Sequence, residues 1–475
     1  MKRILFIVLV LLQGVFSNAF AQPNEGYHGT WTGKLPVGAG LRLVFHIKDN
    51  GQGGLVSSAD SPDQSAFGLK CDTTWVAGGT INIEMHMLNA SYKAKLANDS
   101  TLEGTFTQGM DFPLTLVKTN AAPAKPNHPQ EPQPPFPYKS EDIIYNDAVT
   151  KLSYGATITL PEGKGPFPAA LLITGSGPQN RDEEILGHKT FAVLADALTR
   201  NGFIVLRVDD RGVGKTTGQF KGATTADFAL DARASLNYLR SRPEVDKKKT
   251  GLIGHSEGGM IAPMVAAGNK DVNFIVLLAG PGVKISQLMA EQNAAISHQA
   301  GVSDTAIQAY IKMYTAAYNV ILSTVDTTVA LAKTQDIVND WIAKTDAGLL
   351  RELHLDEPKA QNQLAAAMVN DMQDKWYRYF MTFDPAPYLE QLTCKVLALN
   401  GSKDVQVLSS SNLPAIEAAL KKSKSKVYTV KELPGLNHLF QTCKSCTPVE
   451  YSQLEETFSP VALEEINKWL NTNVK

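Results

Sequence analysis

The segment with the clearest chemical meaning is a G-x-S-x-G pattern at residues 254–258, with Ser256 at its centre. A serine on a sharp turn between a strand and a helix holds its hydroxyl above a sheet edge, where it can act as a nucleophile. Apolar runs lie on both sides of the pattern, and its glycines remove side chains that would clash in the turn. We therefore predict a nucleophile at Ser256, with a plain glycine-rich turn as the alternative. Pro263 should disturb the helix that follows.

A nucleophilic serine needs a base, and this kind of turn is typical of the chain order serine, acid, histidine. The histidines that follow Ser256 are His298, His354 and His438. The first two lie in a segment of helical composition, whereas His438 lies between the last predicted strand and a predicted closing helix. We predict His438 as the base, although a lone histidine more often has only a structural role.

The acid of such a site should follow the strand before the last one. Residues 396–399 form that predicted strand, and Asp404 lies in the loop after it. An aspartate there would orient the imidazole and stabilise its protonated form. We predict Asp404 as the acid. Asp384 is the second choice because it precedes the strand, and an ordinary turn aspartate is the structural alternative.

Stabilising an oxyanion requires two aimed backbone N–H groups. We predict that Glu257, directly after the nucleophile, supplies one and that Ser176, in the loop after the strand ending at residue 173, supplies the other. The Glu257 side chain is expected to face solvent; the alternative is a contact with a polar or cationic substrate group. Residues 209–216 lack the full spacing of a phosphate-binding loop, so we interpret them as a strand-exit loop.

Continuous apolar runs alternate with helical segments through the second part of the chain. This pattern predicts a parallel sheet covered by helices on both faces. Between residues 284 and 384 the strand signals stop and the composition becomes helical, which predicts an inserted lid. Within it, we expect Trp376, Tyr377 and Phe380 to line the substrate site, the alternative being that they form the core of the insertion.

Three further segments precede the parallel sheet. Residues 1–21 have a positive start, an apolar run and small residues before a cleavage point, which predicts a signal peptide and a secreted or periplasmic protein; an uncleaved anchor is the alternative. Residues 22–118 show short alternating strands and predict a small all-β sandwich or barrel. Residues 119–139 are rich in proline and predict an extended linker to a domain at 140–475.

The overall composition narrows the class of partner. A net charge of -2 provides no electrostatic basis for nucleic-acid binding. Nothing after the first segment approaches the length of a membrane span. Of the four cysteines, Cys443 and Cys446 form either a local disulfide or a pair of free thiols, and they have no second pair that would complete a zinc site. Homo-oligomer formation stays open.

Taken together, these features resemble a known family: secreted two-domain bacterial esterases of the α/β-hydrolase superfamily, whose catalytic domain is serine-aminopeptidase-like. The similar segments are 60–64, 175–182, 210–214, 254–259, 376–380, 400–404 and 437–438. Many relatives have a histidine where this chain has Thr174, and the C-x-x-C segment after His438 is not a feature we associate with the family.

The resemblance implies an α/β-hydrolase fold and hydrolysis of small acyl esters with no metal or cofactor. Three function classes stay open. The first is a carboxylesterase for short-acyl or aryl esters. The second is a serine peptidase or aminopeptidase, for which Glu257 is the only obvious anchor for a substrate amine. The third is a non-catalytic binding protein on a hydrolase scaffold.

Overall fold

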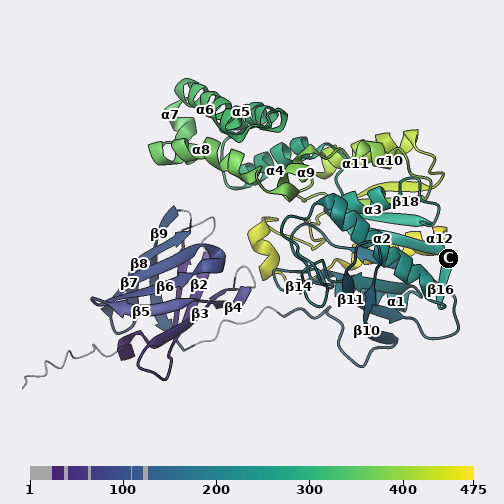
Figure 1. Cartoon of the computed structure of the whole chain (residues 1–475), viewed down its shortest axis with the longest axis horizontal. Helices are drawn as coiled ribbons and strands as arrows, with labels where there is room; N and C mark the ends of the chain where they lie inside the picture. Colours follow the sequence, from purple (N-terminus) through teal and green to yellow (C-terminus); the bar gives the residue numbers. More distant parts are fainter. Residues whose placement is uncertain (1–23, 37–40, 63–65, 109, 121–126) are drawn as a thin grey trace, which may run out of the picture. The chain divides into compact units, whose positions relative to one another are not determined.

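The structure is a computed structural model of the chain, and it describes residues 24–36, 41–62, 66–108, 110–120 and 127–475. The chain divides into two compact units, Met1–Ala124 and Lys125–Lys475, which we call the β unit and the hydrolase unit. Figure 1 shows the two units and the element labels used below. The predicted signal peptide lies outside the described residues, so it stays a prediction.

The β unit is one nine-stranded antiparallel sheet in the order β4-β3-β2-β1-β9-β8-β7-β6-β5. It curls into a half-barrel around a core that includes the fully buried side chains of Trp31, Phe45 and Tyr92. A hydrogen bond of 2.5 Å between the Ser57 and Thr74 hydroxyls links β3 to β5. The all-β prediction is therefore confirmed. Its strands are β1 (Gly29–Leu35), β2 (Leu41–Asp49), β3 (Leu55–Ser61), β4 (Ala66–Lys70), β5 (Thr73–Ala77), β6 (Thr80–Met85), β7 (Ala90–Asn98), β8 (Thr101–Gln108) and β9 (Met110–Thr119).

The hydrolase unit contains an eight-stranded sheet in the order β10-β11-β15-β12-β16-β17-β18-β19. The strands from β15 to β19 are parallel, as their apolar runs predicted. Two antiparallel strands, β10 and β11, extend one edge and were not predicted. The strands are β10 (Lys139–Asn146), β11 (Ser153–Leu160), β12 (Phe167–Ile173), β15 (Ile204–Val208), β16 (Val245–His255), β17 (Phe274–Leu278), β18 (Lys395–Gly401) and β19 (Tyr428–Leu433).

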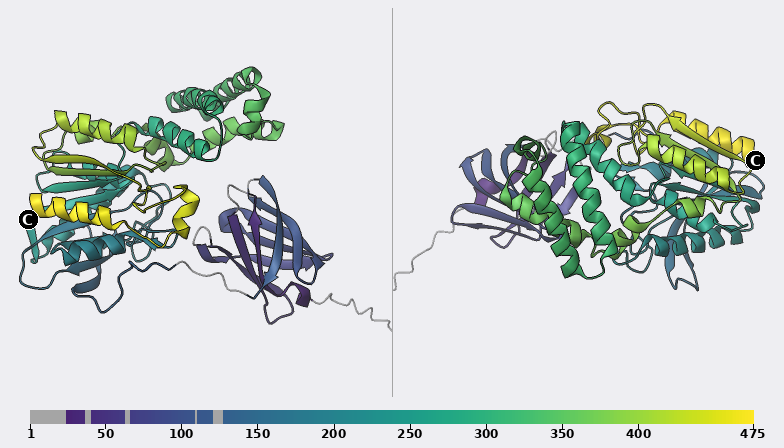
Figure 2. Two further views of the ribbon diagram at one scale, coloured as in Figure 1. Left: turned by 180° about the vertical axis from the view of Figure 1, so that it is seen from behind. Right: turned by 90° about the horizontal axis from the view of Figure 1, so that it is seen from above.

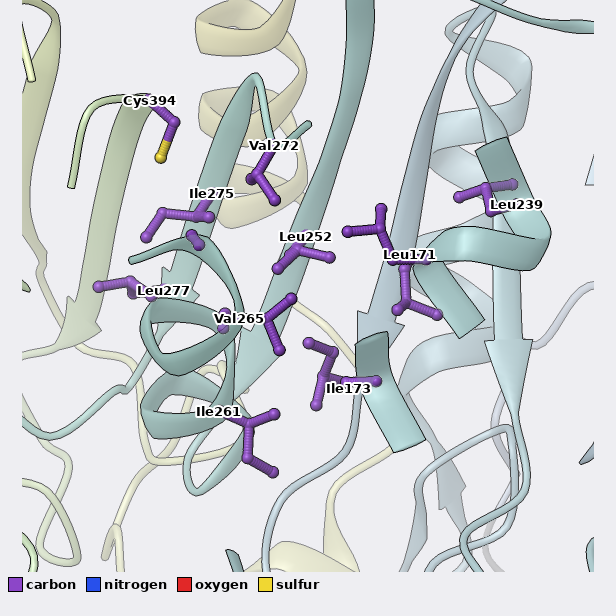
Figure 3. Packing of buried hydrophobic residues seen from close by; sticks show 14 of the residues in the cluster. Leu171, Ile173, Leu239, Leu252, Ile261, Val265, Val272, Ile275, Leu277 and Cys394 are labelled. Atoms are coloured by element: carbon purple, nitrogen blue, oxygen red, sulfur yellow. The ribbon is translucent and has the colours of Figure 1, made fainter. Parts of the chain in front are cut away.

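Helices cover both faces of this sheet. On one face, α2 (Thr225–Ser241), α3 (Gly258–Ala266) and α11 (Ser409–Lys422) enclose an apolar core with the strands. Figure 3 shows this core, where Leu171 and Leu252 of the sheet lie near Ile261 and Val265 of α3. On the other face, α1 (Thr190–Arg200) and α12 (Pro460–Asn473) form a second core. This three-layer architecture is the α/β-hydrolase fold that the resemblance implied.

The segment between β17 and β18 is helical, as its composition predicted. Its helices α5 to α8 project away from the sheet layers, to which α4 and α9 join them (Figure 2). They pack around a core of their own that includes Met313, Met368 and Met372. The helices are α4 (Ile285–Gln299), α5 (Asp304–Ser323), α6 (Thr327–Lys344), α7 (Ala347–Glu352), α8 (Pro358–Asp371) and α9 (Lys375–Thr382), followed by α10 (Ala386–Leu389).

Residues 128–138, the second half of the predicted linker, pack on the hydrolase unit. The Gln130 side chain accepts hydrogen bonds from the backbone amides of Thr457 and Phe458 and donates one to the Phe458 carbonyl. Tyr138 donates to Asp196 of α1 at 2.8 Å. A proline-rich segment can therefore be well anchored through side chains. Among the described residues, none of the helices combines the length and the apolar character needed to cross a bilayer.

Candidate active site

The turn between β16 and α3 holds Ser256 in a strained conformation. Its φ of +53° is in the left-handed region, which side-chain-bearing residues rarely adopt, and its amide donates to the Leu278 carbonyl of β17 at 2.9 Å. A Cβ atom on Gly254 would overlap the Gly258 carbonyl, and one on Gly258 would overlap the Ile173 carbonyl. The glycines of the motif are thus required by close backbone contacts. Pro263, which we expected to disturb the helix, lies inside α3, and the helix continues to Ala266.

Two loops at the same edge of the sheet bring Asp404 and His438 together. His438 Nδ1 lies 2.8 Å from Asp404 Oδ2, and both side chains are buried, with exposures of 6% and 0%. The other carboxylate oxygen of Asp404 accepts from the amides of Gln406 and Val407. Gly401 allows the loops to approach, because a Cβ there would overlap the Leu436 carbonyl. The pair is therefore fixed from both sides.

The structure disfavours the second choice for the acid. Asp384 accepts a hydrogen bond from the Ala386 amide and forms an ion pair with Lys284 at 4.0 Å. It makes no hydrogen bond with His438 in the described part of the chain. Asp404 is therefore the carboxylate that can orient the imidazole.

The Asp404–His438 pair lies beside the turn that holds Ser256, which we call the nucleophile elbow. The contact is made by His255, the residue before Ser256. His255 Nε2 lies 3.0 Å from the His438 carbonyl oxygen, and the two imidazole rings are 4.9 Å apart between centroids. Within the described residues, the Ser256 hydroxyl makes no hydrogen bond with His438. Such nucleophile–base contacts are often long in ligand-free proteins and shorten when substrate binds.

The loop after β12 passes directly beside the nucleophile. A Cβ on Gly175 would lie 3.3 Å from the Ser256 Cβ, so any side chain there would crowd the serine. The Gly175 amide is used by Glu183 Oε1 at 2.7 Å. In the described structure, the amides of Ser176 and Glu257 have no acceptor, which leaves both available to an oxyanion. Thr174, where many relatives have histidine, donates to Asp210 Oδ1 at 2.8 Å and so anchors the loop.

The Glu257 side chain does not face solvent, so that expectation is wrong. The residue is only 2% exposed, and its Oε1 accepts hydrogen bonds from the Thr225 hydroxyl at 2.6 Å and the Trp376 indole at 2.9 Å. Burial raises the pKa of Glu257, although these two donors oppose the shift. The cause is the packing of α2 and α9 over the elbow, which is not visible in the local sequence.

The aromatic residues of α9 have different surroundings. Trp376 and Tyr377 line a groove, whereas Phe380 is buried in the core of the insertion and stacks on Trp376 with 5.0 Å between ring centroids. Phe380 does not line this groove, so its expected substrate contact is not supported by its position. The groove is lined by Phe220, Lys221, Gly222, Asn370, Asp371, Asp374, Trp376 and Tyr377.

Sequence reasoning assigned no role to two residues at the centre of this site, Glu183 and His255. Both are buried, and they contact each other and the loops of the candidate nucleophile and base. The local signals were present, because Glu183 directly follows the similar segment 175–182 and His255 lies inside the G-x-S-x-G pattern. Their contact joins positions far apart in the chain and leaves no periodic signal.

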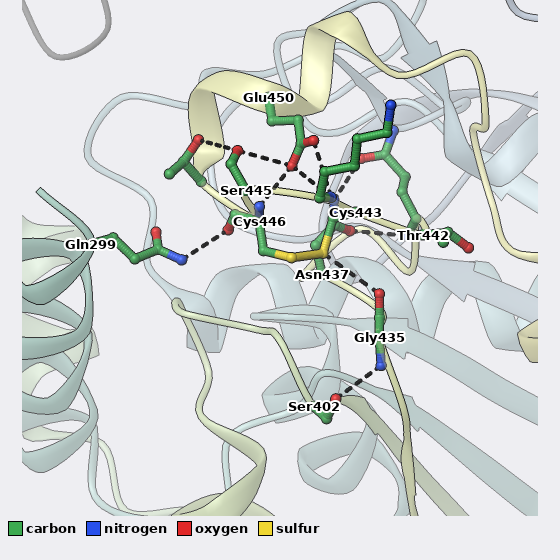
Figure 4. The surroundings of a disulfide bond; sticks show 12 residues. Gln299, Ser402, Gly435, Asn437, Thr442, Cys443, Ser445, Cys446 and Glu450 are labelled. Atoms are coloured by element: carbon green, nitrogen blue, oxygen red, sulfur yellow. Dashed lines mark hydrogen bonds between the residues drawn. A yellow bond between two sulfur atoms is a disulfide. The ribbon is translucent and has the colours of Figure 1, made fainter.

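The disulfide joins Cys443 and Cys446 in the turn that follows His438 (Figure 4). The Glu450 carboxylate accepts from the amides of Lys444 and Cys446 in the same turn. Gln299, at the end of α4, donates to the Cys446 carbonyl at 3.2 Å. The described residues contain no group of three or more His, Cys, Asp or Glu side chains arranged to hold a metal ion.

Comparisons with known proteins agree with this architecture. The sequence model of the family described as serine aminopeptidase, S33, matches residues 188–442. Esterase EstD of Thermotoga maritima is 26% identical over 337 residues, covering 71% of this chain and 68% of EstD. Protein bem46 of Schizosaccharomyces pombe is 27% identical over 164 residues, covering 32% of this chain and 53% of that protein.

Solved structures of low sequence identity also match this chain. An esterase of Pyrococcus furiosus has a TM-score of 0.42 at 12% identity and covers 75% of this chain and 100% of that chain. The α/β hydrolase GrgF of Penicillium has a TM-score of 0.43 at 13% identity and covers 71% of this chain and 99% of that chain. Because the family model matches more than half of the sequence, this chain belongs to the serine aminopeptidase S33 family of α/β hydrolases.

Proposed function

We propose that this protein is a carboxylesterase that uses Ser256 as nucleophile, His438 as base and Asp404 as acid. The observation that carries the proposal is the buried Asp404–His438 hydrogen bond of 2.8 Å, which lies next to the strained turn of Ser256. A carboxylate held by two backbone amides stays oriented toward the imidazole and stabilises its protonated form. An oriented acid–base pair beside a strained serine turn supports the assignment of a serine hydrolase.

In the proposed reaction, His438 Nε2 accepts the Ser256 proton while Ser256 Oγ attacks the ester carbonyl carbon. The negative charge that develops on the carbonyl oxygen is stabilised by the N–H groups of Ser176 and Glu257. The ester bond breaks, and the alcohol leaves with the proton from His438. Water, deprotonated by the same imidazole, then attacks the acyl-enzyme and releases the acid and the free serine. The Asp404 side chain keeps the imidazole oriented throughout.

Esters are favoured over peptides because of the surroundings of Glu257. An aminopeptidase needs an anionic group that can bind the substrate amine, and Glu257 was the sequence candidate. Its Oε1 is already occupied by Thr225 and Trp376, and burial favours its neutral form. EstD carries an esterase name as well. The family description favours aminopeptidase activity as the second candidate.

Labelling and kinetics test the proposal. A fluorophosphonate should modify Ser256 in the wild type, and Ser256→Ala should lose labelling and at least about 10⁴-fold in kcat. His438→Ala should cost a similar factor, and the two losses should not add. Ser241→Ala, an exposed serine of the same unit, is the matched control. A phosphonate adduct on another serine would contradict the assignment, and absence of any adduct would favour the non-catalytic class.

Substrate choice separates the two enzymatic classes. We expect p-nitrophenyl esters of short acids to be hydrolysed much faster than aminoacyl p-nitroanilides. The reverse order would favour the aminopeptidase.

We also propose that the protein is exported after removal of residues 1–21, because the sequence of that segment has the pattern of a signal peptide. N-terminal sequencing of exported protein should begin at Gln22.

A further inference from the structure

A buried pair of titratable side chains, Glu183 and His255, lies in the middle of the candidate active site. His255 Nδ1 is 3.0 Å from Glu183 Oε1, and the side chains are 3% and 0% exposed. Glu183 precedes the short strand β13 (Glu184–Ile185), and its φ of +48° is in the left-handed region. Strained residues of this kind persist only where the surrounding structure holds them, and they cluster at functional sites.

This pair connects the three segments that the proposed mechanism uses. Glu183 Oε1 also accepts from the Gly175 amide at 2.7 Å, in the loop of the predicted oxyanion donor. His255 directly precedes the nucleophile, and its Nε2 reaches the backbone carbonyl of His438 at 3.0 Å. One carboxylate and one imidazole thus join the oxyanion loop, the nucleophile elbow and the loop of the base.

The neighbours of the ring determine its protonation state. Nδ1 of His255 faces a Glu183 carboxyl oxygen that also accepts from the Gly175 amide, and Nε2 faces the His438 carbonyl oxygen, which can only accept. Donation from the ring to both oxygens requires a proton on each nitrogen, that is, an imidazolium, and charge-assisted hydrogen bonds of this kind are stronger than neutral ones. Burial alone would lower the pKa of His255, but the Glu183 charge and these hydrogen bonds raise it overall.

We propose that Glu183 and His255 act as a positioning pair. The pair holds the Ser176 amide, Ser256 and His438 in the relative positions that attack on the ester requires. This inference rests on the proposed function. Because the Glu183 carboxylate uses the Gly175 amide, it directs the next amide, that of Ser176, toward the substrate. Because His255 donates to the His438 carbonyl, it holds the base at the elbow. Neither residue touches the reacting atoms.

The variant Glu183→Gln tests the pair with little change in shape. Without the carboxylate charge, His255 keeps one proton and loses one of its two hydrogen bonds. Small displacements of reacting groups can reduce rates by roughly 10²-fold, so we expect kcat on p-nitrophenyl acetate to fall by about that factor while KM changes little. Glu184→Gln, the exposed neighbour, is the matched control and should behave as the wild type.

Two variants of His255 separate the halves of the pair. His255→Gln can place an N–H near the Nε2 position and keep the contact with the His438 carbonyl. His255→Asn can place one near Nδ1 and keep the contact with Glu183. Each should lose part of the rate. Because His255→Gln has already lost the contact with Glu183, adding Glu183→Gln to it should cost little more, whereas adding Glu183→Gln to His255→Asn should cause a further loss. These variants also decide the question if Glu183→Gln fails to fold.

The experiment counts active molecules by exhaustive phosphonate labelling of Ser256, so kcat refers to folded sites only. A drop in kcat at unchanged KM supports the proposal. A wild-type kcat per counted active site in Glu183→Gln, or in both His255 variants, overturns it, because a purely structural pair would change only the amount of folded protein. Failure of the wild type to label at Ser256 would instead overturn the proposed function.

Discussion

At the scale of single residues, Asp210 beneath the oxyanion loop has the clearest consequence for pH dependence. Its Oδ1 accepts from Thr174 and its Oδ2 accepts from the Gln179 amide at 2.8 Å. Burial raises the pKa of Asp210 from 3.8 to about 7, although these two donors oppose the shift. Between these two values the folded protein binds a proton that the unfolded chain has released.

We therefore predict a specific effect of Asp210→Asn. The stabilisation from the raised pKa of Asp210 is fully present below about pH 4 and is lost as the pH rises through about 7. An asparagine can accept from Gln179 and donate to Thr174, and it does not ionise. The free energy of unfolding of the variant, relative to wild type, should rise steadily between pH 4 and 7. Urea denaturation of both proteins at several pH values in this range measures the difference in free energy of unfolding. A difference that stays constant from pH 4 to pH 7 would contradict the prediction.

At the scale of elements, helix α9 contributes residues both to the lining of the groove and to the core of the insertion. Trp376 and Tyr377 line the groove, and Phe380 belongs to the core of the insertion. We predict that Trp376→Ala and Tyr377→Ala shift the chain-length preference among p-nitrophenyl esters while Ser256 still reacts with the phosphonate. Phe380→Ala should instead destabilise the protein by about 3–5 kcal/mol, because it removes a buried aromatic ring.

Kinetics and thermal unfolding of the three variants separate these effects. Tyr379→Ala is a matched aromatic control on the same helix, because Tyr379 does not line the groove. If both Trp376 and Tyr377 variants fold and keep the wild-type preference, the insertion does not determine specificity.

Two separate interactions, the disulfide and the Glu450 carboxylate, hold the turn after His438. Glu450 accepts from the amides of Lys444 and Cys446 and from the Ser445 hydroxyl (Figure 4). We predict that Cys443→Ser combined with Cys446→Ser leaves kcat on short esters little changed, because Glu450 still holds the turn. Adding Glu450→Gln should then cost more than the separate changes do, with a coupling energy of about 0.5–3 kcal/mol in a double-mutant cycle on stability. If the stability losses from removing the disulfide and from Glu450→Gln are additive, the two interactions act independently and the prediction is wrong.

At the scale of the whole molecule, the boundary of the hydrolase unit lies before the anchoring residue Gln130. A chain that begins at Asn127 keeps the three hydrogen bonds of Gln130, whereas one that begins at Tyr138 loses them and leaves the amides of Thr457 and Phe458 without acceptors. We predict that both chains are soluble and react at Ser256. The shorter chain should unfold at a temperature lower by roughly 5 °C or more.

Thermal unfolding of the two truncated chains measures this difference. Gln130→Ala in the longer chain isolates the anchor and should reproduce most of the loss. Equal unfolding temperatures would show that the packed segment contributes nothing. Loss of phosphonate labelling in the chain beginning at Asn127 would mean that the β unit contributes to the active-site wall.

The sequence by itself determined the fold class and named the residues of the proposed reaction. Parallel strands leave continuous apolar runs, and the insertion leaves a helical composition without strand signals, so both are readable locally. The chain order of Ser256, Asp404 and His438 follows from the order of the strands that precede them. The structure then brings Asp404 and His438 to 2.8 Å from each other, although the two residues lie in separate loops.

Only the tertiary structure decided what surrounds those residues. The burial of Glu257 depends on α2 and α9, and the Glu183–His255 pair joins a loop after β12 to the end of β16. The position of Phe380 in a core and the anchoring of Gln130 beside Phe458 are likewise contacts between distant segments. Such contacts involve one side chain at a time, so they produce no periodicity or composition change. Local sequence patterns encode elements, whereas the pairing of single polar groups is set when those elements pack.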